Sequence, residues 1–398
     1  MGLEVIPPSA RRAGRPRMLR GRLLCTVLLV LGAVASARGS PYLPQSDAEV
    51  LAHLAPGTSH ASVPLRREAS SRLDVALPLA QFYLTQARSS GDLRFLGYAE
   101  AVLAPWRAAA TPDPSVLVLE ATMLQSRHAF EASLRELDLA LEARPGDAQA
   151  WLTRATVLRV LGRYAEARAS CERFGAVAEA AVGELCTASV SALEGHLASA
   201  YQALRALPHE ALAPPARAWR YSELGEMAER LGDDRAAEHW YLEALRVAPE
   251  DLYTRAAYAD LLLHARRAAE VPTLLEGKES IEPLLLRIAL AQSQLHDPQL
   301  ARTRAQLANA FSVEEARGEA VHRREEARFL LSIAGDPAAA LEAAEENWST
   351  QHEPADLLVL LEAAQAAHRP QAAAPAVEFI HQHRTEDVRL APYLASRP

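Results

Sequence analysis

The side chains best suited to metal chemistry lie near the C-terminus, where His381 and His383 are followed by Glu386 and Asp387. Imidazole nitrogens and carboxylate oxygens are common ligands of Zn²⁺ in proteins. The two histidines are two residues apart, however, and at that spacing side chains on a helix point in different directions. We therefore interpret the segment as the polar end of a helix and predict no metal site there.

Catalytic motifs are missing from the sequence. It contains no G-x-S-x-G nucleophile elbow and no H-E-x-x-H zinc motif, and Gly277-Lys278-Glu279 lacks the upstream glycine and the hydroxyl of a phosphate loop. The acidic pairs Glu325-Glu326 and Glu345-Glu346 are expected on solvated helix faces rather than as acid/base pairs. We predict no catalytic residue and no cofactor, and we do not expect an enzyme.

The first 37 residues have the pattern of a signal peptide. Six arginines precede an apolar run from Leu23 to Ala35, and Ala35-Ser36-Ala37 is a small-residue cleavage site. The run of 13 residues is shorter than the ~20 that a membrane-spanning helix needs. We expect cleavage after Ala37 and export; the alternative is an uncleaved anchor, which would be the chain's only contact with a membrane.

Composition limits the partners of the exported chain. Loss of the leader would take the net charge from −8 to about −13, which argues against a nucleic-acid partner. Lys278 is the only lysine among 42 basic residues, a preference typical of GC-rich bacterial genomes. We therefore expect the periplasm or cell envelope of a Gram-negative bacterium. Residues 38–70, rich in Pro, Ser and Gly, are predicted to be an N-terminal arm or linker.

Two cysteines, Cys171 and Cys186, follow the leader. In an oxidising compartment an even pair of cysteines is often bridged. Both are expected on neighbouring helices that pack together. The sequence leaves two alternatives, a Cys171–Cys186 disulfide or two buried free thiols.

The elements that position these side chains are helices, and the clearest pair lies between Ala218 and Asp251. Tyr221, Leu224 and Ala228 recur at three- and four-residue steps, as on the apolar face of a helix. Alanine, leucine, arginine and glutamate dominate the whole chain, and no stretch shows the alternation of a strand. We predict an all-α protein.

The same helix pair recurs along the chain at a nearly constant interval. The predicted turns between paired helices are separated by 31 to 38 residues and lie at His128, Gly162, Gly195, Gly232, Arg266, Asp297, Gly335 and His368. Repeats of this length indicate a solenoid, in which each unit buries its apolar face only by stacking on its neighbours.

In its repeated residues the chain resembles the tetratricopeptide repeat superfamily, whose unit is a 34-residue antiparallel helix pair. The resemblance also covers Ala121, Phe130, Leu137, Ala140 and Pro145, and its main packing positions are Trp151, Ala155, Gly162, Ala167, Gly225, Gly232, Ala237, Tyr241, Ala244 and Pro249. It implies a right-handed superhelical α-solenoid. The array is expected at 71–275, with degenerate repeats at 283–398 and the polar loop Glu276–Glu282 as a hinge.

The resemblance also implies a binding style, in which the first helices of successive pairs line a concave groove. The groove residues expected from the register are Arg159, Trp219, Glu226, Tyr253, Asp260 and His264. We predict a scaffold that binds a protein or an extended peptide in the cell envelope. The alternatives are a periplasmic metal- or small-ligand-binding helical protein and an enzyme built on an α-solenoid.

Overall fold

The computed structural model describes residues 62–317 and 322–394, and every regular element in this part of the chain is helical. The all-α prediction is confirmed; the predicted signal peptide lies outside the described residues. The first half comprises α1 (Ser62–Ala69), α2 (Leu73–Ser90), α3 (Arg94–Arg107), α4 (Pro114–Ser126), α5 (Phe130–Ala143), α6 (Ala148–Val160), α7 (Tyr164–Val177), α8 (Ala180–Ser191), α9 (Leu197–Ala206), α10 (Pro214–Arg230) and α11 (Asp234–Val247).

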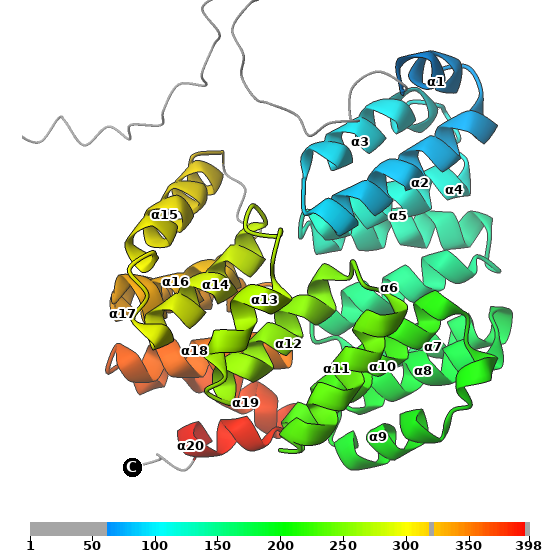
Figure 1. The fold of residues 1–398 in the computed structure, drawn as a ribbon. Coiled ribbons are helices and arrows are strands. Elements are labelled where there is room, and N and C mark those ends of the chain that lie inside the picture. Colours follow the sequence, from blue (N-terminus) through cyan, green and yellow to red (C-terminus); the bar gives the residue numbers. More distant parts are fainter. Residues whose placement is uncertain (1–61, 318–321, 395–398) are drawn as a thin grey trace, which may run out of the picture. The chain divides into compact units, whose positions relative to one another are not determined.

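The second half continues the order and includes several short elements between the longer helices (Figure 1). It comprises α12 (Leu252–His264), α13 (Val271–Leu274), α14 (Glu282–Leu295), α15 (Leu300–Arg317), α16 (Arg323–Phe329), a π-helical turn (Leu330–Ala334), α17 (Pro337–Trp348), α18 (Pro354–Ala366), α19 (Ala374–His383) and α20 (Ala391–Leu394). None of the helices in the described ranges is long and apolar enough to cross a membrane.

The turns between paired helices lie where the repeat interval predicts them. Seven of the eight predicted turn residues adopt a left-handed backbone, and the eighth, Asp297, directly follows the left-handed His296. A residue with a left-handed backbone ends a helix, because the N–H groups at the end can then bond to the free carbonyl oxygens of the last turn. Glycine adopts this conformation without strain, which explains Gly162 and Gly232 at two of these turns.

Small residues bring the two helices of the best repeat into close contact. Ala237, Tyr241 and Ala244 of α11 are fully buried against α10. A Cβ atom added to Gly225 would overlap the ring of Tyr241. Glycine at this helical position is therefore explained by packing, despite its cost of about 1 kcal/mol in helix propensity.

A second close approach joins α7 to α8, where the sequence departs from the repeat pattern. A Cβ atom added to Gly183 would lie only 2.6 Å from the Cα atom of Gly175, so the two backbones approach closely because both residues are glycine. Cys171 of α7 and Cys186 of α8 form a disulfide, with their Cα atoms 5.5 Å apart. Both cysteines are buried.

The N-terminal arm predicted at 38–70 includes a packed helix in its described part. Ala69, the last residue of α1, is buried, and its carbonyl oxygen accepts a 3.0 Å hydrogen bond from the Trp106 indole. The predicted boundary loop also contributes to packing, since Ile281 belongs to the apolar core shared by α8–α14.

The C-terminal segment crosses the turns of three middle repeats, a contact that the repeat pattern does not predict. Phe379 packs on Gly162, Arg384 on Gly195 and Val388 on Gly232. Hydrogen bonds secure the crossing: the backbone N–H of Leu197 donates to Glu386 Oε2 at 2.7 Å, and the backbone N–H of His352 donates to the Val160 carbonyl at 2.8 Å.

Candidate binding site on the inner wall

The first helices of successive pairs meet along an inner wall that is held by ion pairs. Arg159 of α6 contacts Glu223 of α10 at 2.6 Å, although the pair α8–α9 lies between them in the sequence. Arg159 also faces Glu353, which precedes α18, at 3.7 Å. These contacts bring helices from both halves of the chain to one surface.

Asp260 of α12 forms a second junction on this wall. Its carboxylate contacts the guanidinium groups of Arg287 on α14 and Arg328 on α16, each at 2.7 Å. Burial raises the pKa of the carboxyl, but the two arginine charges outweigh that effect and hold the pKa at about 2. Asp260, a predicted groove residue, is therefore ionised and fixed within a network.

Glu325 belongs to the same network, and the prediction that it is solvated is wrong. Its side chain is buried and contacts Arg287 at 3.4 Å and Arg324 at 3.5 Å. Burial raises its pKa, but the neighbouring arginine charges lower it far below the usual value. The sequence places Glu325 beside Glu326 without showing which arginines the fold brings to it. Glu345 and Glu346 are exposed, as predicted.

Tyr253 is the large side chain that this wall leaves accessible. It is 51% exposed, and its hydroxyl hydrogen-bonds Glu226 of the preceding first helix, α10. Arg159 and Glu353 also lie close enough to act on it electrostatically. Tyr253 therefore combines an exposed ring with a position beside the charged side chains of the wall.

Glu226 differs from the other carboxylates of the wall because it forms no ion pair with any residue that the structure describes. Burial and then the charge of Glu223 raise the pKa of Glu226, and Arg159 lowers it less, so the pKa is about 8. An added positive charge at this position would favour the ionised carboxylate and lower that pKa again.

The remaining predicted groove residues, Trp219 and His264, differ in how exposed their side chains are. Trp219 is half-buried against two apolar clusters, and its indole N–H donates to Glu223 at 2.9 Å. It therefore supports the wall instead of presenting a free ring. His264, the last residue of α12, is exposed.

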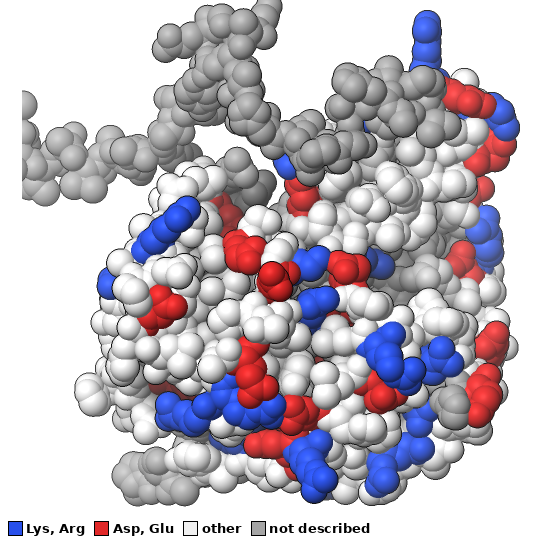
Figure 2. All heavy atoms as spheres, viewed as in Figure 1, with Lys and Arg blue, Asp and Glu red and all other residues white. Residues whose placement is uncertain are grey.

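We call the connected groups the inner-wall cluster. Its members are Arg159, Glu223, Glu226, Tyr253, Asp260, Arg287, Arg324, Glu325, Arg328, Glu353 and Asp356. Carboxyl groups outnumber arginines in this set. Acidic and basic side chains are interspersed on the face shown in Figure 2.

Of the two histidines near the C-terminus, His383 takes part in packing and His381 is exposed. The ring of His383 lies 4.8 Å from that of Tyr164 and 4.3 Å from that of Phe379. The nearby Glu386 accepts from the Leu197 backbone, and Asp387 pairs with Arg389 at 2.7 Å. Among the described residues, the group with metal-ligand geometry is instead Glu282, Glu314 and His322.

A separate cavity of about 700 Å³ lies between α7, α8 and α9. Its lining is mainly apolar and includes Cys171, Gly183 and Leu204. Because the clustered charges lie elsewhere, on the first helices, we place the candidate site at the inner wall.

No protein-family model matches the chain, and no curated protein matches its sequence. Among solved structures, it is similar to the pilF protein of Pseudomonas aeruginosa, at 15% identity over 64% of this chain and 97% of that one, with a TM-score of 0.32. It is similar to the TPR domain of P58(IPK) at 14% identity over 71% and 96% of the two chains, with a TM-score of 0.25.

A third similar structure is that of Naa15/Naa10 bound to HypK-THB, at 12% identity over 81% of this chain and 64% of that one, with a TM-score of 0.24. These values are too low to establish a shared overall structure. The chain is described by its own helices, as a stack of antiparallel pairs whose first helices form a charged inner wall.

Proposed function

We propose that this chain is an exported helical-repeat scaffold that binds a segment of a partner protein at its inner wall, around Tyr253 and Glu226. The observation that carries the proposal is Tyr253, an aromatic side chain that is 51% exposed in a surface whose other members, apart from Glu226, are held in ion pairs. An exposed tyrosine on a rigid frame offers a large contact area at little entropic cost.

The charge of the wall favours a basic partner segment. The inner-wall cluster has more carboxyl groups than arginines, and Glu226 has no arginine of its own in an ion pair. An arginine or lysine of the partner placed beside Glu226 would form the missing pair, and an extended segment would suit a solenoid surface. Complementary charge of this kind contributes specificity and a faster association rate.

Export is part of the proposal and is supported by two features. The leader has the composition of a signal peptide, and the two cysteines that follow it are bridged in α7 and α8. Structural disulfides persist in the periplasm and are rare in the cytosol. We infer that the partner is a protein of the bacterial cell envelope.

The proposal is tested by capture of partners from an envelope fraction with wild-type chain and two alanine variants. Tyr253→Ala removes the exposed ring of the wall. Leu242→Ala is the matched control, since Leu242 is 49% exposed on α11, the second helix of the neighbouring pair. We expect Tyr253→Ala to lose a partner that wild type and Leu242→Ala retain, as quantified by mass spectrometry. Equal recovery with all three proteins would refute binding at Tyr253.

A further inference from the structure

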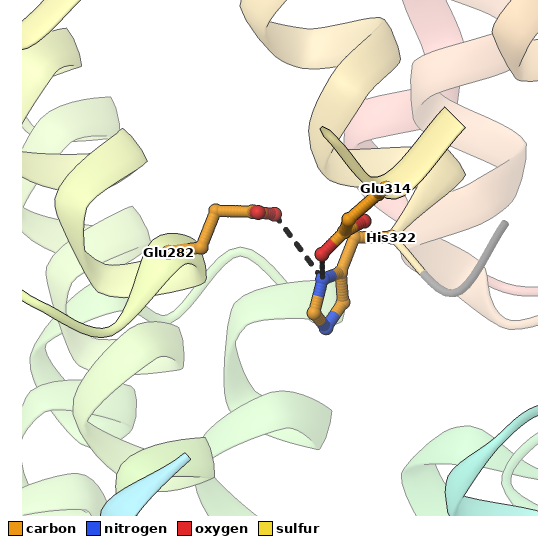
Figure 3. Close-up of side chains that lie close together, drawn as sticks. All are labelled: Glu282, Glu314 and His322. Carbon is orange, nitrogen blue, oxygen red and sulfur yellow. Dashed lines mark hydrogen bonds and ion pairs between the residues drawn. The ribbon is translucent and has the colours of Figure 1, made fainter. Parts of the chain in front are cut away.

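Three potential metal ligands from separate helices converge beside the second half of the array. Figure 3 shows Glu282 and Glu314 directed toward the imidazole of His322. Glu282 is the first residue of α14, Glu314 lies in the last turn of α15, and His322 immediately precedes α16. All three ligand atoms lie within 4.8 Å of one another.

One imidazole nitrogen lies between the two carboxylates of this group. His322 Nδ1 is 3.1 Å from a carboxylate oxygen of Glu282 and 3.1 Å from one of Glu314. A single ring nitrogen carries at most one proton, so it donates a well-aligned hydrogen bond to only one of the two oxygens. The Glu282 oxygen in this contact, Oε1, is buried and accepts no well-aligned hydrogen bond.

We propose that Glu282, Glu314 and His322 bind a divalent transition-metal ion, of which Zn²⁺ is the best candidate. Tetrahedral Zn²⁺ holds nitrogen and oxygen ligands at about 2.0–2.2 Å, which separates neighbouring ligands by roughly 3.3 Å. The two 3.1 Å separations at His322 are close to this value. A nitrogen ligand favours Zn²⁺ over Mg²⁺ or Ca²⁺, which prefer oxygen.

Charge and burial agree with the assignment. Two carboxylates and a neutral imidazole carry two negative charges, which a divalent ion neutralises. The side chains of Glu282, Glu314 and His322 are 14%, 19% and 23% exposed, so the ligands are sheltered but the site is open to an incoming ion. Three protein ligands leave one tetrahedral position for solvent or for a group from a partner. The ion would fix the start of α14 to the end of α15 and the start of α16.

The site is tested by calorimetric titration of the purified, chelator-treated chain with Zn²⁺ alone. We expect one equivalent to bind, and the variants Glu282→Gln, Glu314→Gln and His322→Gln each to weaken binding at least about 100-fold. Glu345→Gln and His381→Gln are matched controls on exposed positions and should bind as wild type does. Circular dichroism establishes that each variant is folded.

A second measurement needs no variant. Co²⁺ in place of Zn²⁺ should give the intense visible absorption of a four-coordinate ion, and added Zn²⁺ should abolish it. Failure of the wild-type chain to bind a stoichiometric ion would overturn the proposal and leave an ion-paired histidine. Unchanged binding in all three ligand variants would overturn it as well.

Discussion

Between α10 and α11 the backbone of Gly225 packs against the buried ring of Tyr241. Between α12 and α16, by contrast, Asp260 meets the guanidinium of Arg328 at 2.7 Å. The first contact spans 16 positions of sequence and involves no charge. The second spans 68 positions and is wholly ionic. Apolar packing therefore holds the helices within a pair, and ion pairs hold distant first helices along the inner wall.

The two kinds of contact have different consequences for the stability of the fold and for the binding of a partner. Apolar contacts between close helices depend on shape and change little with salt or pH. Ion pairs fix the orientation of several helices around one surface, and their net contribution to stability depends on how well each charge is compensated. The inner wall around Tyr253 is thus the part of the molecule whose ion pairs a charged partner can change.

The sharpest test of the comparison removes a buried arginine of the wall. Arg287→Met leaves Asp260 and Glu325 with one arginine fewer in a buried setting, so we expect a loss of about 3–5 kcal/mol in the free energy of unfolding. Arg246→Met is the control, because Arg246 is exposed and its pair with Glu243 should be worth under about 1 kcal/mol. Equal denaturation midpoints for the two variants would contradict a stabilising ionic wall.

Loss of the disulfide should have the next largest effect. The bridge closes a loop with a sequence separation of 15, and its removal in Cys171→Ser/Cys186→Ser should cost about 3 kcal/mol. Thermal melts of the double variant, and of wild type with and without reductant, measure this. Intact-mass analysis of the native protein after alkylation is the check, and two modified thiols would show that the bridge is not formed.

Gly225→Leu tests the apolar side of the comparison. The added side chain would overlap the fully buried ring of Tyr241, and overpacking of this kind costs about 1–3 kcal/mol. Gly97→Leu is the control, since Gly97 lies in α3 with open space where a side chain would go. A lower melting temperature is expected for Gly225→Leu alone, and an unchanged one would disprove the close approach of α10 and α11.

The smallest expected effect depends on pH. Because the pKa of Glu226 is about 8 in the folded chain and 4.5 ordinarily, the folded chain keeps a proton that the unfolded chain releases between these values. The free energy of unfolding therefore falls as pH rises through this window. Glu226→Gln, which stays neutral, should melt above wild type at pH 8 and close to it at pH 4.5. An equal difference at both pH values would argue against a protonated Glu226.

The sequence predicts the repeated pairs well because their signals are local. The interval between turns depends on glycine and on helix length, and the interval from Gly225 to Tyr241 fits one antiparallel pair. It predicts the inner wall less well, since Glu325 also contacts Arg287, which lies 38 positions away in the sequence. The same holds for Phe379 on Gly162, which joins positions more than 200 residues apart.

The site residues show the same limit. Placing Tyr253 and Glu226 on one surface needs only the register of two neighbouring repeats, and the sequence supports that step. Trp219 is partly covered because it contacts Glu223 and two apolar clusters, and these contacts are seen only in the folded chain. The convergence of Glu282 with His322 crosses the helix α15, and no local spacing indicates it.

The most direct test of recognition at the inner wall is photo-crosslinking from position 253 itself. A photoreactive phenylalanine analogue at position 253 is compared with the same analogue at position 242, after illumination of cells that express each protein. We expect a crosslinked partner from position 253 and none from position 242, with the partner's crosslinked segment rich in lysine or arginine. No product from position 253, or the same product from both positions, would contradict the account.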